Sequence, residues 1–301
     1  MTTRRLAVLT TALGAVLALG ACAAPGSTGG GGSSDDASGD GGTTVTVGVV
    51  GAGDAHWDVL VDKAAEAGIT LELQNFSDYQ LPNQALSQGE LDANQFQHLQ
   101  FLAEFNVNTD SDLVPVGATA VYPLGLYSTA HASVEEIPDG GEVAIPNDPT
   151  NQARALLVLQ EAGLVTLTDG GSSLSTPADI EDSRVTVTPV DAGQTAISLQ
   201  SVDAAIINND YVGEADLTPE DSIFEDDPAS AASEPYINVW AVQAEDADDE
   251  TIAQLVELFH DPEVEAAHQE ESGGTAVFVD RPASELQEIL AGIEENLRAQ
   301  G

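Results

Sequence analysis

An arginine and two asparagines at the start of one expected helix are the side chains in this chain best suited to hold a carboxylate. The stretch 145–160 reads Ile-Pro-Asn-Asp-Pro-Thr-Asn-Gln-Ala-Arg-Ala-Leu-Leu-Val-Leu-Gln. Asp148 can act as the N-cap, because a proline follows it at the first helical position, where proline is favoured. Asn147, Asn151 and Arg154 are spaced by four and three residues, so we expect them on one face near the helix start. That end of a helix is positive and a guanidinium can clamp a carboxylate with two parallel bonds, which predicts a carboxylate receptor.

Basic residues are scarce, which gives this arginine weight. The chain has 301 residues with 7 Lys and Arg against 51 Asp and Glu, a formal net charge of -44. Nucleic acid is therefore a poor partner, because binding phosphates requires a basic patch. The acidic residues indicate a solvated surface suited to high ionic strength, and they lack the loop spacing of a calcium site. The alternative for Arg154 is a surface arginine that offsets nearby acids.

The first 44 residues predict export and anchoring. Arg4 and Arg5 precede an apolar run at 6–19, and the only cysteine, Cys22, follows two small residues. This order is typical of a signal peptide at residues 1–21. The end of the run resembles the bacterial lipobox, which implies cleavage before Cys22 and acylation of that residue. Residues 22–44 would then be the lipidated cysteine and a disordered tether rich in Gly, Ser and Asp. We expect the protein to be lipid-anchored at the cell membrane, facing the extracytoplasmic side; the alternative is an ordinary signal peptide with a chance cysteine.

From residue 45 onward, short apolar strands alternate with amphipathic helices. This alternation is typical of α/β proteins with parallel-rich sheets. The expected strands are 45–50, 70–74, 113–119, 125–128, 143–145, 185–190, 204–207 and 237–243. The expected helices are 57–67, 82–88, 96–105, the one that starts at Pro149, 194–201, 251–259, 262–270 and 283–299.

Four motifs, taken in order, carry a family resemblance. They are 76–83 (Phe-Ser-Asp-Tyr-Gln-Leu-Pro-Asn) with 89–98 after it, 145–154, 202–211 (Val-Asp-Ala-Ala-Ile-Ile-Asn-Asn-Asp-Tyr) and 235–240 (Pro-Tyr-Ile-Asn-Val-Trp). Their order and spacing resemble the methionine-binding lipoproteins of the NlpA/MetQ type, which are substrate-binding components of methionine ABC importers. The resemblance covers nearly all of residues 45–280, and the segment beyond Arg281 looks like an extension.

The resemblance implies a two-lobed periplasmic-binding fold, with two parallel-rich sheets flanked by helices and a ligand cleft between the lobes. Crossover strands would lie near 122–128 and 236–243. One lobe would comprise 45–122 plus 237–301 and the other 123–236, closing on the ligand by a hinge motion. The implied partners are methionine, an ABC permease with its ATPase, and the membrane through acylated Cys22. No cofactor is implied.

The resemblance also assigns the ligand site. A thioether favours a polarizable pocket lined by aromatic rings. Arg154 matches the position that clamps the substrate carboxylate, and neutral amides suit the rest of an amino-acid backbone. His98 is expected as a pocket wall or hydrogen-bond donor rather than a metal ligand. The predicted ligand-binding residues are Tyr79, Phe96, His98, Asn147, Asn151, Arg154, Asn208, Asn209 and Asn238, with Phe101 as a neighbour and one of the pair Asn208/Asn209 in contact with ligand.

Departures from the family pattern leave the exact ligand open. Gln95 replaces an aromatic residue common in relatives, and Gln100-Phe101 replaces a Pro-Tyr pair, which could reshape the side-chain pocket. Another apolar amino acid, or a dipeptide containing methionine, is therefore an alternative ligand. A metal-binding lipoprotein is a weaker alternative, because the spacing offers no His/carboxylate cluster. The sequence does not favour an enzyme: it has no G-x-S-x-G, H-E-x-x-H or P-loop motif, and no cysteine in the body.

Overall fold

The computed structural model describes residues 42–300. The expected signal peptide, Cys22 and most of the tether lie outside the described residues. The described residues belong to one compact unit. Within residues 42–300, no helix combines the length and apolar character that crossing a bilayer requires.

One five-stranded sheet has the order β2-β1-β3-β13-β4 and forms the part we call lobe 1. β1 pairs in parallel with β2 and β3, whereas β13 is antiparallel to β3 and β4. Its strands are β1 Thr43–Val50, β2 Ile69–Phe76, β3 Ala93–His98, β4 Val114–Ala118 and β13 Asn238–Val242.

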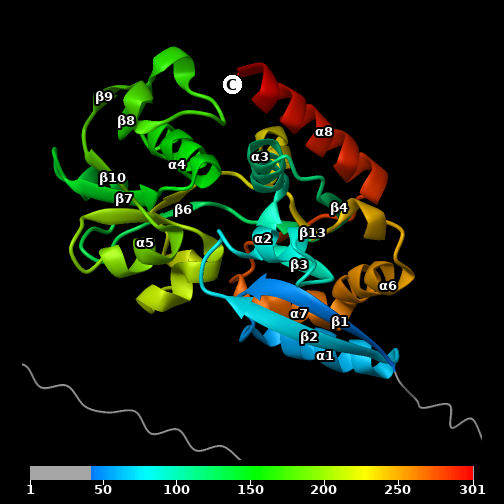
Figure 1. Cartoon of the computed structure of the whole chain (residues 1–301). Coiled ribbons are helices and arrows are strands. Elements are labelled where there is room, and N and C mark those ends of the chain that lie inside the picture. Colours follow the sequence, from blue (N-terminus) through cyan, green and yellow to red (C-terminus); the bar gives the residue numbers. More distant parts are fainter. Residues whose placement is uncertain (1–41, 301) are drawn as a thin grey trace, which may run out of the picture. The chain divides into compact units, whose positions relative to one another are not determined.

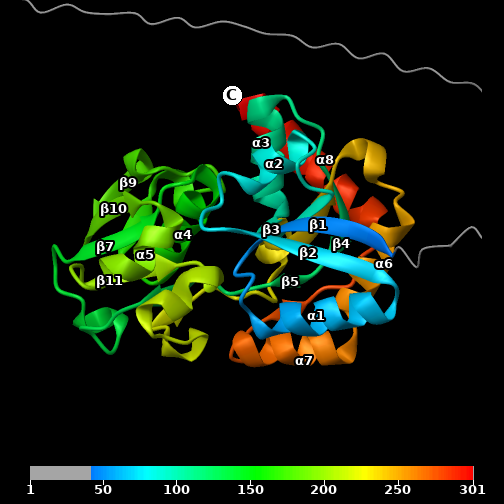
Figure 2. The same ribbon diagram turned by 60° about the horizontal axis from the view of Figure 1, so that its bottom comes forward.

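Helices cover both faces of this sheet, because its strands are apolar on both sides. Alternation along β13 sends Trp240 and Val242 into one core and Val239 and Ala241 into the other. Figure 2 shows α1 and α7 side by side against one face, and Figure 1 shows α8 running along α3 on the other. The helices are α1 Ala55–Glu66, α6 Glu250–Phe259 and α7 Pro262–Glu271 on the first face, and α2 Pro82–Ser87, α3 Leu99–Thr109 and α8 Ala283–Gln300 on the second.

A second five-stranded sheet, in the order β10-β7-β11-β6-β12, forms the part we call lobe 2. β7 is parallel to β10 and β11, and β6 is antiparallel to β11 and β12. Helix α4, Pro149–Glu161, packs on one face and α5, Ala192–Ser198, on the other. The strands are β6 Gly125–Tyr127, β7 Glu142–Pro146, β10 Thr186–Val190, β11 Ala204–Ile207 and β12 Phe224–Glu225, with a separate hairpin of β8 Val165–Leu167 and β9 Ile180–Ser183.

The chain passes between the two sheets twice. It leaves lobe 1 after β4 through β5, Ala120–Val121, which pairs with β14, Val277–Phe278. It returns through the 3-10 segment Ala231–Tyr236 into β13. These two sheet-rich lobes and their helices confirm the expected α/β fold class.

The prediction was wrong at one position that matters for the site. Residues 96–98 were expected inside a helix spanning 96–105, but they end strand β3, and α3 begins only at Leu99. Every residue of β3 is buried, although the strand reads Ala-Asn-Gln-Phe-Gln-His. The buried amides satisfy one another: Gln97 Nε2 donates to Asn83 Oδ1 at 2.7 Å and to Asn94 Oδ1 at 2.9 Å. This internal network lets a polar segment form a central strand.

Candidate functional site

Helix α4 positions the central arginine. Asp148 caps the helix, accepting from the Asn151 backbone N–H at 3.0 Å, with Pro149 at the first helical position. This start confirms the expected helix-start signal. The cap fixes the first turn, so Asn151 and Arg154 both point off the same end of the helix. Arg154 is buried, with only 5% of its surface exposed.

The guanidinium of Arg154 already holds partners from its own protein. Nε donates to Oδ2 of Asp226 at 2.8 Å, and Nη2 donates to Oδ1 of Asp226 at 3.1 Å and to the Tyr122 carbonyl at 2.8 Å. The ring of Tyr236 lies 4.3 Å from its central carbon. Asp226 therefore forms, at the Nε/Nη2 edge, the two-bond clamp that we expected Arg154 to offer a ligand carboxylate. Among residues 42–300, nothing hydrogen-bonds to Nη1, and Arg154 lines a cavity, so Nη1 is the nitrogen left for a ligand.

A chain of amides and an imidazole lies beside Arg154 and joins the lobes. His98 Nε2 lies 3.3 Å from Asn151 Oδ1, and Asn208 Nδ2 donates to the same oxygen at 2.9 Å. Burial, and then the charge of Arg154, lower the pKa of His98 to about 3. His98 is therefore neutral; its Nδ1 accepts from the Phe101 backbone N–H at 3.1 Å, which leaves the proton on Nε2. Among the described residues, the buried Oδ1 of Asn208 has no partner, so it can accept a bond from a ligand.

Aromatic rings gather on the lobe 1 side of this network. The ring of Tyr79 lies 6.0 Å from Phe96 and 6.1 Å from Phe101, and Phe96 lies 5.8 Å from Phe101. The ring of Tyr211, from lobe 2, lies 5.2 Å from Tyr79. Ring edges at this spacing suit a thioether or another apolar side chain.

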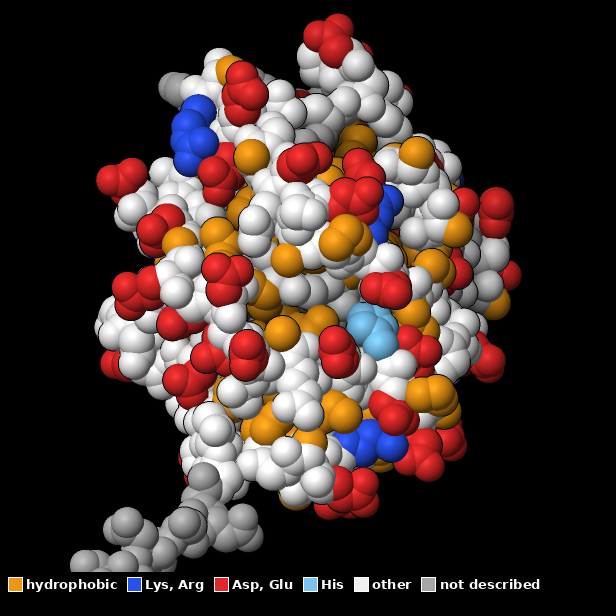
Figure 3. All heavy atoms as spheres, turned by 90° about the vertical axis from the view of Figure 1, so that its right-hand side faces the viewer, with side chains coloured by type: hydrophobic (Ala, Val, Ile, Leu, Met, Phe, Trp, Pro, Cys, Tyr) orange, Lys and Arg blue, Asp and Glu red, His pale blue; other side chains and the backbone are white. Residues whose placement is uncertain are grey.

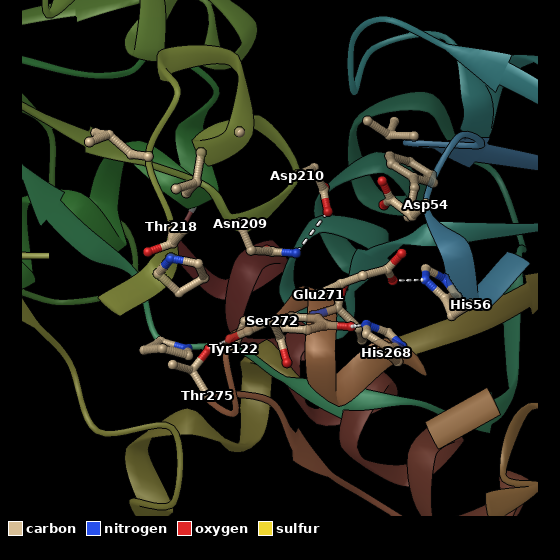
Figure 4. A pocket seen from close by; sticks show the side chains of 18 of the residues that line it. Asp54, His56, Tyr122, Asn209, Asp210, Thr218, His268, Glu271, Ser272 and Thr275 are labelled. Atoms are coloured by element: carbon tan, nitrogen blue, oxygen red, sulfur yellow. Dashed lines mark hydrogen bonds and ion pairs between the residues drawn. The ribbon is translucent and has the colours of Figure 1, made fainter. Parts of the chain in front are cut away.

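Two cavities open onto these groups. The smaller, about 20 Å³, lies between Arg154 and the aromatic rings and has room for roughly one water molecule. The larger, about 320 Å³, is lined by both lobes. Figure 4 shows this larger cavity, with Asn209 and Asp210 on one side and Asp54, His56 and Glu271 on the other. The two cavities share Phe96, Tyr122, Pro123, Asn209, Asp210 and Asn238 in their walls.

The structure brings together nearly all of the residues expected to bind ligand. Asn147 is the exception: it is exposed, precedes the N-cap of α4 and lines neither cavity. It lies outside the helical turn, so the four-residue spacing to Asn151 does not place the two on one face. The residues that line the cavities are Tyr79, Phe96, His98, Asn151, Arg154, Asn208, Asn209 and Asn238, with Phe101 beside them.

Four further residues belong to this region and were missed. Tyr122 and Tyr236 lie on the two crossovers, and Asp226 follows the short strand β12. Asp210 follows Asn208 and Asn209 directly, so the motif that named these asparagines already contained it. No local signal marks Asp226 as the partner of Arg154, because 72 residues separate them.

The expectation that the chain lacks a His/carboxylate cluster was wrong. Ligand atoms of Asp54, His56 and Glu271 all lie within 4.8 Å of one another. His56 Nδ1 lies 2.6 Å from one carboxylate oxygen of Glu271, and the Ala55 backbone N–H donates to the other. Burial raises the pKa of Glu271, but the hydrogen bond and charge of His56 outweigh it and hold the pKa below its usual value. Sequence spacing could not reveal this cluster, because Glu271 lies at the end of α7, 215 residues from His56.

The fold and the site define the class of this protein. It is a two-lobed substrate-binding protein, a class that holds small molecules between two sheet-based lobes joined by two passages of the chain.

Comparison with known proteins gives the family. The model of the NlpA lipoprotein family matches residues 45–279. The D-methionine-binding lipoprotein MetQ of Salmonella typhi is 38% identical over 238 residues, 76% of this chain and 86% of that protein. The chain belongs to the NlpA lipoprotein family.

Solved structures agree with this assignment. The substrate-binding protein of a methionine transporter from Streptococcus pneumoniae is 36% identical with a TM-score of 0.74, covering 78% of this chain and 95% of that one. A nutrient-binding protein from Burkholderia cenocepacia, solved bound to methionine, is 35% identical with a TM-score of 0.73, covering 78% of this chain and 99% of that one.

Proposed function

We propose that this protein captures free methionine outside the cytoplasm and delivers it to an ABC importer. The observation that carries the proposal is Nη1 of Arg154, which has no hydrogen-bond partner among residues 42–300 and lies at a cavity that aromatic rings line on the other side. Methionine carries a carboxylate at one end and a thioether at the other. The carboxylate matches Arg154, and the thioether matches the aromatic rings. The names of the Streptococcus and Burkholderia proteins support this choice of ligand.

Each group has a role in this proposal. Arg154 binds the ligand carboxylate through Nη1, and Asn208 accepts from a ligand N–H through Oδ1, which has no partner within residues 42–300. Tyr79, Phe96 and Phe101 surround the thioether. The space between them is only about 20 Å³, so the rings must move apart, or the lobes open, to admit methionine.

A larger ligand is the second candidate. The 320 Å³ cavity adjoins the smaller one, and Gln95, which departs from the family pattern, lines it. That space suits a dipeptide containing methionine, or another apolar amino acid, held by the same Arg154.

We further propose that Cys22 carries the lipid anchor and that a permease with its ATPase receives the ligand. The acidic surface in Figure 3, where Asp and Glu side chains far outnumber Lys and Arg, suits an aqueous compartment rather than a nucleic-acid partner. Fractionation of cells that express Cys22→Ala tests the anchor: the wild type is expected with the membranes and the variant in the soluble fraction. Equal membrane association of both proteins would contradict the anchor.

Ligand identity is tested by equilibrium dialysis of the full-length protein in detergent against radiolabelled L-methionine. The competitors are D-methionine, the other amino acids and methionine dipeptides, after removal of any ligand that copurifies. Displacement by methionine alone supports the first candidate, and stronger displacement by a dipeptide supports the second. A protein that binds none of them contradicts the proposed function.

A further inference from the structure

One carboxylate at the junction of the two cavities has no cationic partner among residues 42–300. Asp210 is partly buried and lies in the wall of both cavities, on the 3-10 segment Asn209–Ala215 of lobe 2. Its partners are neutral: Tyr79 O–H donates to Oδ2 at 2.6 Å and Asn209 Nδ2 donates to Oδ1 at 2.7 Å. A carboxylate removed from bulk water normally has a positive partner as well.

We propose that Asp210 binds the α-ammonium group of the transported amino acid. This inference rests on the proposed function, and it names the residue of this chain that recognises the free amino group of the ligand. Arg154 and Asp210 line the same small cavity, so they offer one positive and one negative group to the two charges of a zwitterion. Oδ1 of Asn208, in the same wall, has no partner in the described part of the chain and is a second acceptor for an ammonium proton.

The charges around Asp210 favour a cation at this place. Figure 4 shows Asp210 across the cavity from Asp54 and Glu271, and among residues 42–300 no Lys or Arg lines this larger cavity. Burial, and to a lesser degree the charge of Asp54, raise the pKa of Asp210 to about 6 despite the bond from Tyr79. A bound ammonium would relieve both effects, because it supplies charge-assisted hydrogen bonds where only neutral donors are present.

A metal ion is the competing occupant, and the contacts favour it less. Asp54, His56 and Glu271 lie close enough to share an ion. However, both oxygens of Glu271 already accept bonds, from His56 Nδ1 and from the Ala55 backbone. A metal bound by both His56 Nδ1 and Glu271 would have to break the bond between them. An ammonium can instead bond to the remaining lone pairs of the Asp210 oxygens, each of which accepts one bond, and it displaces no partner.

The test compares L-methionine with 4-(methylthio)butanoate, which keeps the carboxylate and thioether but lacks the amine. Both are measured by equilibrium dialysis on full-length wild type, Asp210→Asn, Asp210→Glu and Glu214→Gln. Asp210→Asn keeps the size and the hydrogen-bonding shape while removing the charge. Glu214 lies exposed on the same segment and serves as the matched control. The thermal midpoint of each variant checks that it folds.

We expect wild type to bind methionine at least about tenfold more tightly than the deaminated analogue, the factor expected of hydrogen bonds to a charged group. Asp210→Asn should lose at least about tenfold for methionine and less than about twofold for the analogue. Asp210→Glu should retain part of the preference, and Glu214→Gln all of it.

Three results would overturn the assignment. Wild type that binds both compounds equally shows that no group recognises the amine, and this result holds even if Asp210→Asn fails to fold. An equal loss for both compounds in Asp210→Asn shows a structural role. Methionine binding that requires added Zn²⁺ and disappears with EDTA assigns the cavity acids to a metal. If wild type binds neither compound, the proposed function itself is wrong. This outcome differs from the three above, which contradict only the role of Asp210.

Discussion

The carboxylate of Asp226 holds the guanidinium of Arg154 through two hydrogen bonds, of 2.8 Å from Nε and 3.1 Å from Nη2. Arg154 also contacts the carbonyl of Tyr122 on one crossover and the ring of Tyr236 on the other. These contacts hold the guanidinium in one position, so little side-chain conformational entropy remains to be lost on binding. Because Arg154 contacts both crossovers, a ligand bound at Nη1 is linked through Arg154 to the segments that connect the lobes.

Arg154→Lys should abolish most ligand binding while leaving a folded protein. A lysine carries the charge but has no planar fork, so it cannot bind Asp226, the Tyr122 carbonyl and a ligand carboxylate together. We expect methionine affinity to fall about 10- to 100-fold, as when a charged hydrogen bond of 1.5–3 kcal/mol is lost. Equilibrium dialysis measures the affinity, and Arg184→Lys, at a half-exposed surface arginine, is the control. Equal affinity of wild type and Arg154→Lys would contradict the role of the fork.

Two neighbouring tyrosines should respond in opposite ways to the same deletion. Tyr79 O–H donates to Asp210 across the lobes at 2.6 Å, whereas the buried hydroxyl of Tyr211 has no partner among residues 42–300. Tyr79→Phe should lower the free energy of unfolding by about 1 to 3 kcal/mol, because it removes a donor to a charged group. Tyr211→Phe should leave it unchanged or raise it, since a buried polar group without a partner costs free energy. Urea unfolding measures the free energy of unfolding of both variants. A larger decrease in Tyr211→Phe than in Tyr79→Phe would show that the Tyr211 hydroxyl is hydrogen-bonded.

Local patterns in the sequence predicted the parts of the site that depend on one element. The cap at Asp148, the proline after it and the apolar positions of α4 predicted where Arg154 lies in its helix, and the structure places it there. The family motifs predicted which aromatic rings and amides share a cleft. The strand at 96–98 was missed because its buried residues are mostly amides, whose network with Asn83 no periodicity reveals.

Pairings between distant segments could not be predicted. The pairings of Asp226 with Arg154 and of Glu271 with His56 join residues far apart in the chain, and the acidic residues are too numerous for any one to stand out. For Asn147 a local pattern misled the prediction. Asn147 lies four residues before Asn151, but it precedes the N-cap of α4, and a four-residue spacing places two residues on one face only when both lie in the helix.

The C-terminal helix α8 should contribute to stability although it lies beyond the residues that the family model matches. Leu286 and Leu290 are buried in the core that α8 shares with α2 and α3. Leu290→Ala should lower the free energy of unfolding by about 2 to 5 kcal/mol, the cost of removing a buried leucine side chain. Glu288→Ala, at an exposed position of the same helix, is the control and should change it by less than about 0.5 kcal/mol. Equal effects in urea unfolding would show that α8 is not part of the core.

Glu104 should make stability depend on pH. It lies on α3 of lobe 1 and lines a cavity of about 420 Å³ with Pro149 and Arg298. Burial, and then the charge of Asp148 on lobe 2, raise its pKa from 4.5 to about 7, against a weak bond from Asn108. The folded state then binds the proton of Glu104 more tightly than the unfolded state does. Below about pH 4.5 Glu104 is protonated in both states and does not affect the free energy of unfolding. As the pH rises from 4.5 to 7 the buried carboxylate increasingly destabilises the folded state, and above pH 7 this destabilisation is complete.

Glu104→Gln should therefore be more stable than wild type at pH 8, and the difference should vanish near pH 4. Solvent around the half-buried side chain screens the repulsion, so we expect about 1 to 2 kcal/mol at pH 8. Urea unfolding at several pH values measures the difference directly. Asp54 and Asp210, whose pKa values are also raised, titrate in both proteins and cancel in the comparison. Glu90→Gln, at an exposed glutamate, controls for the loss of one negative charge from an acidic protein. A difference that does not change with pH would show that Glu104 ionises as it does in the unfolded chain.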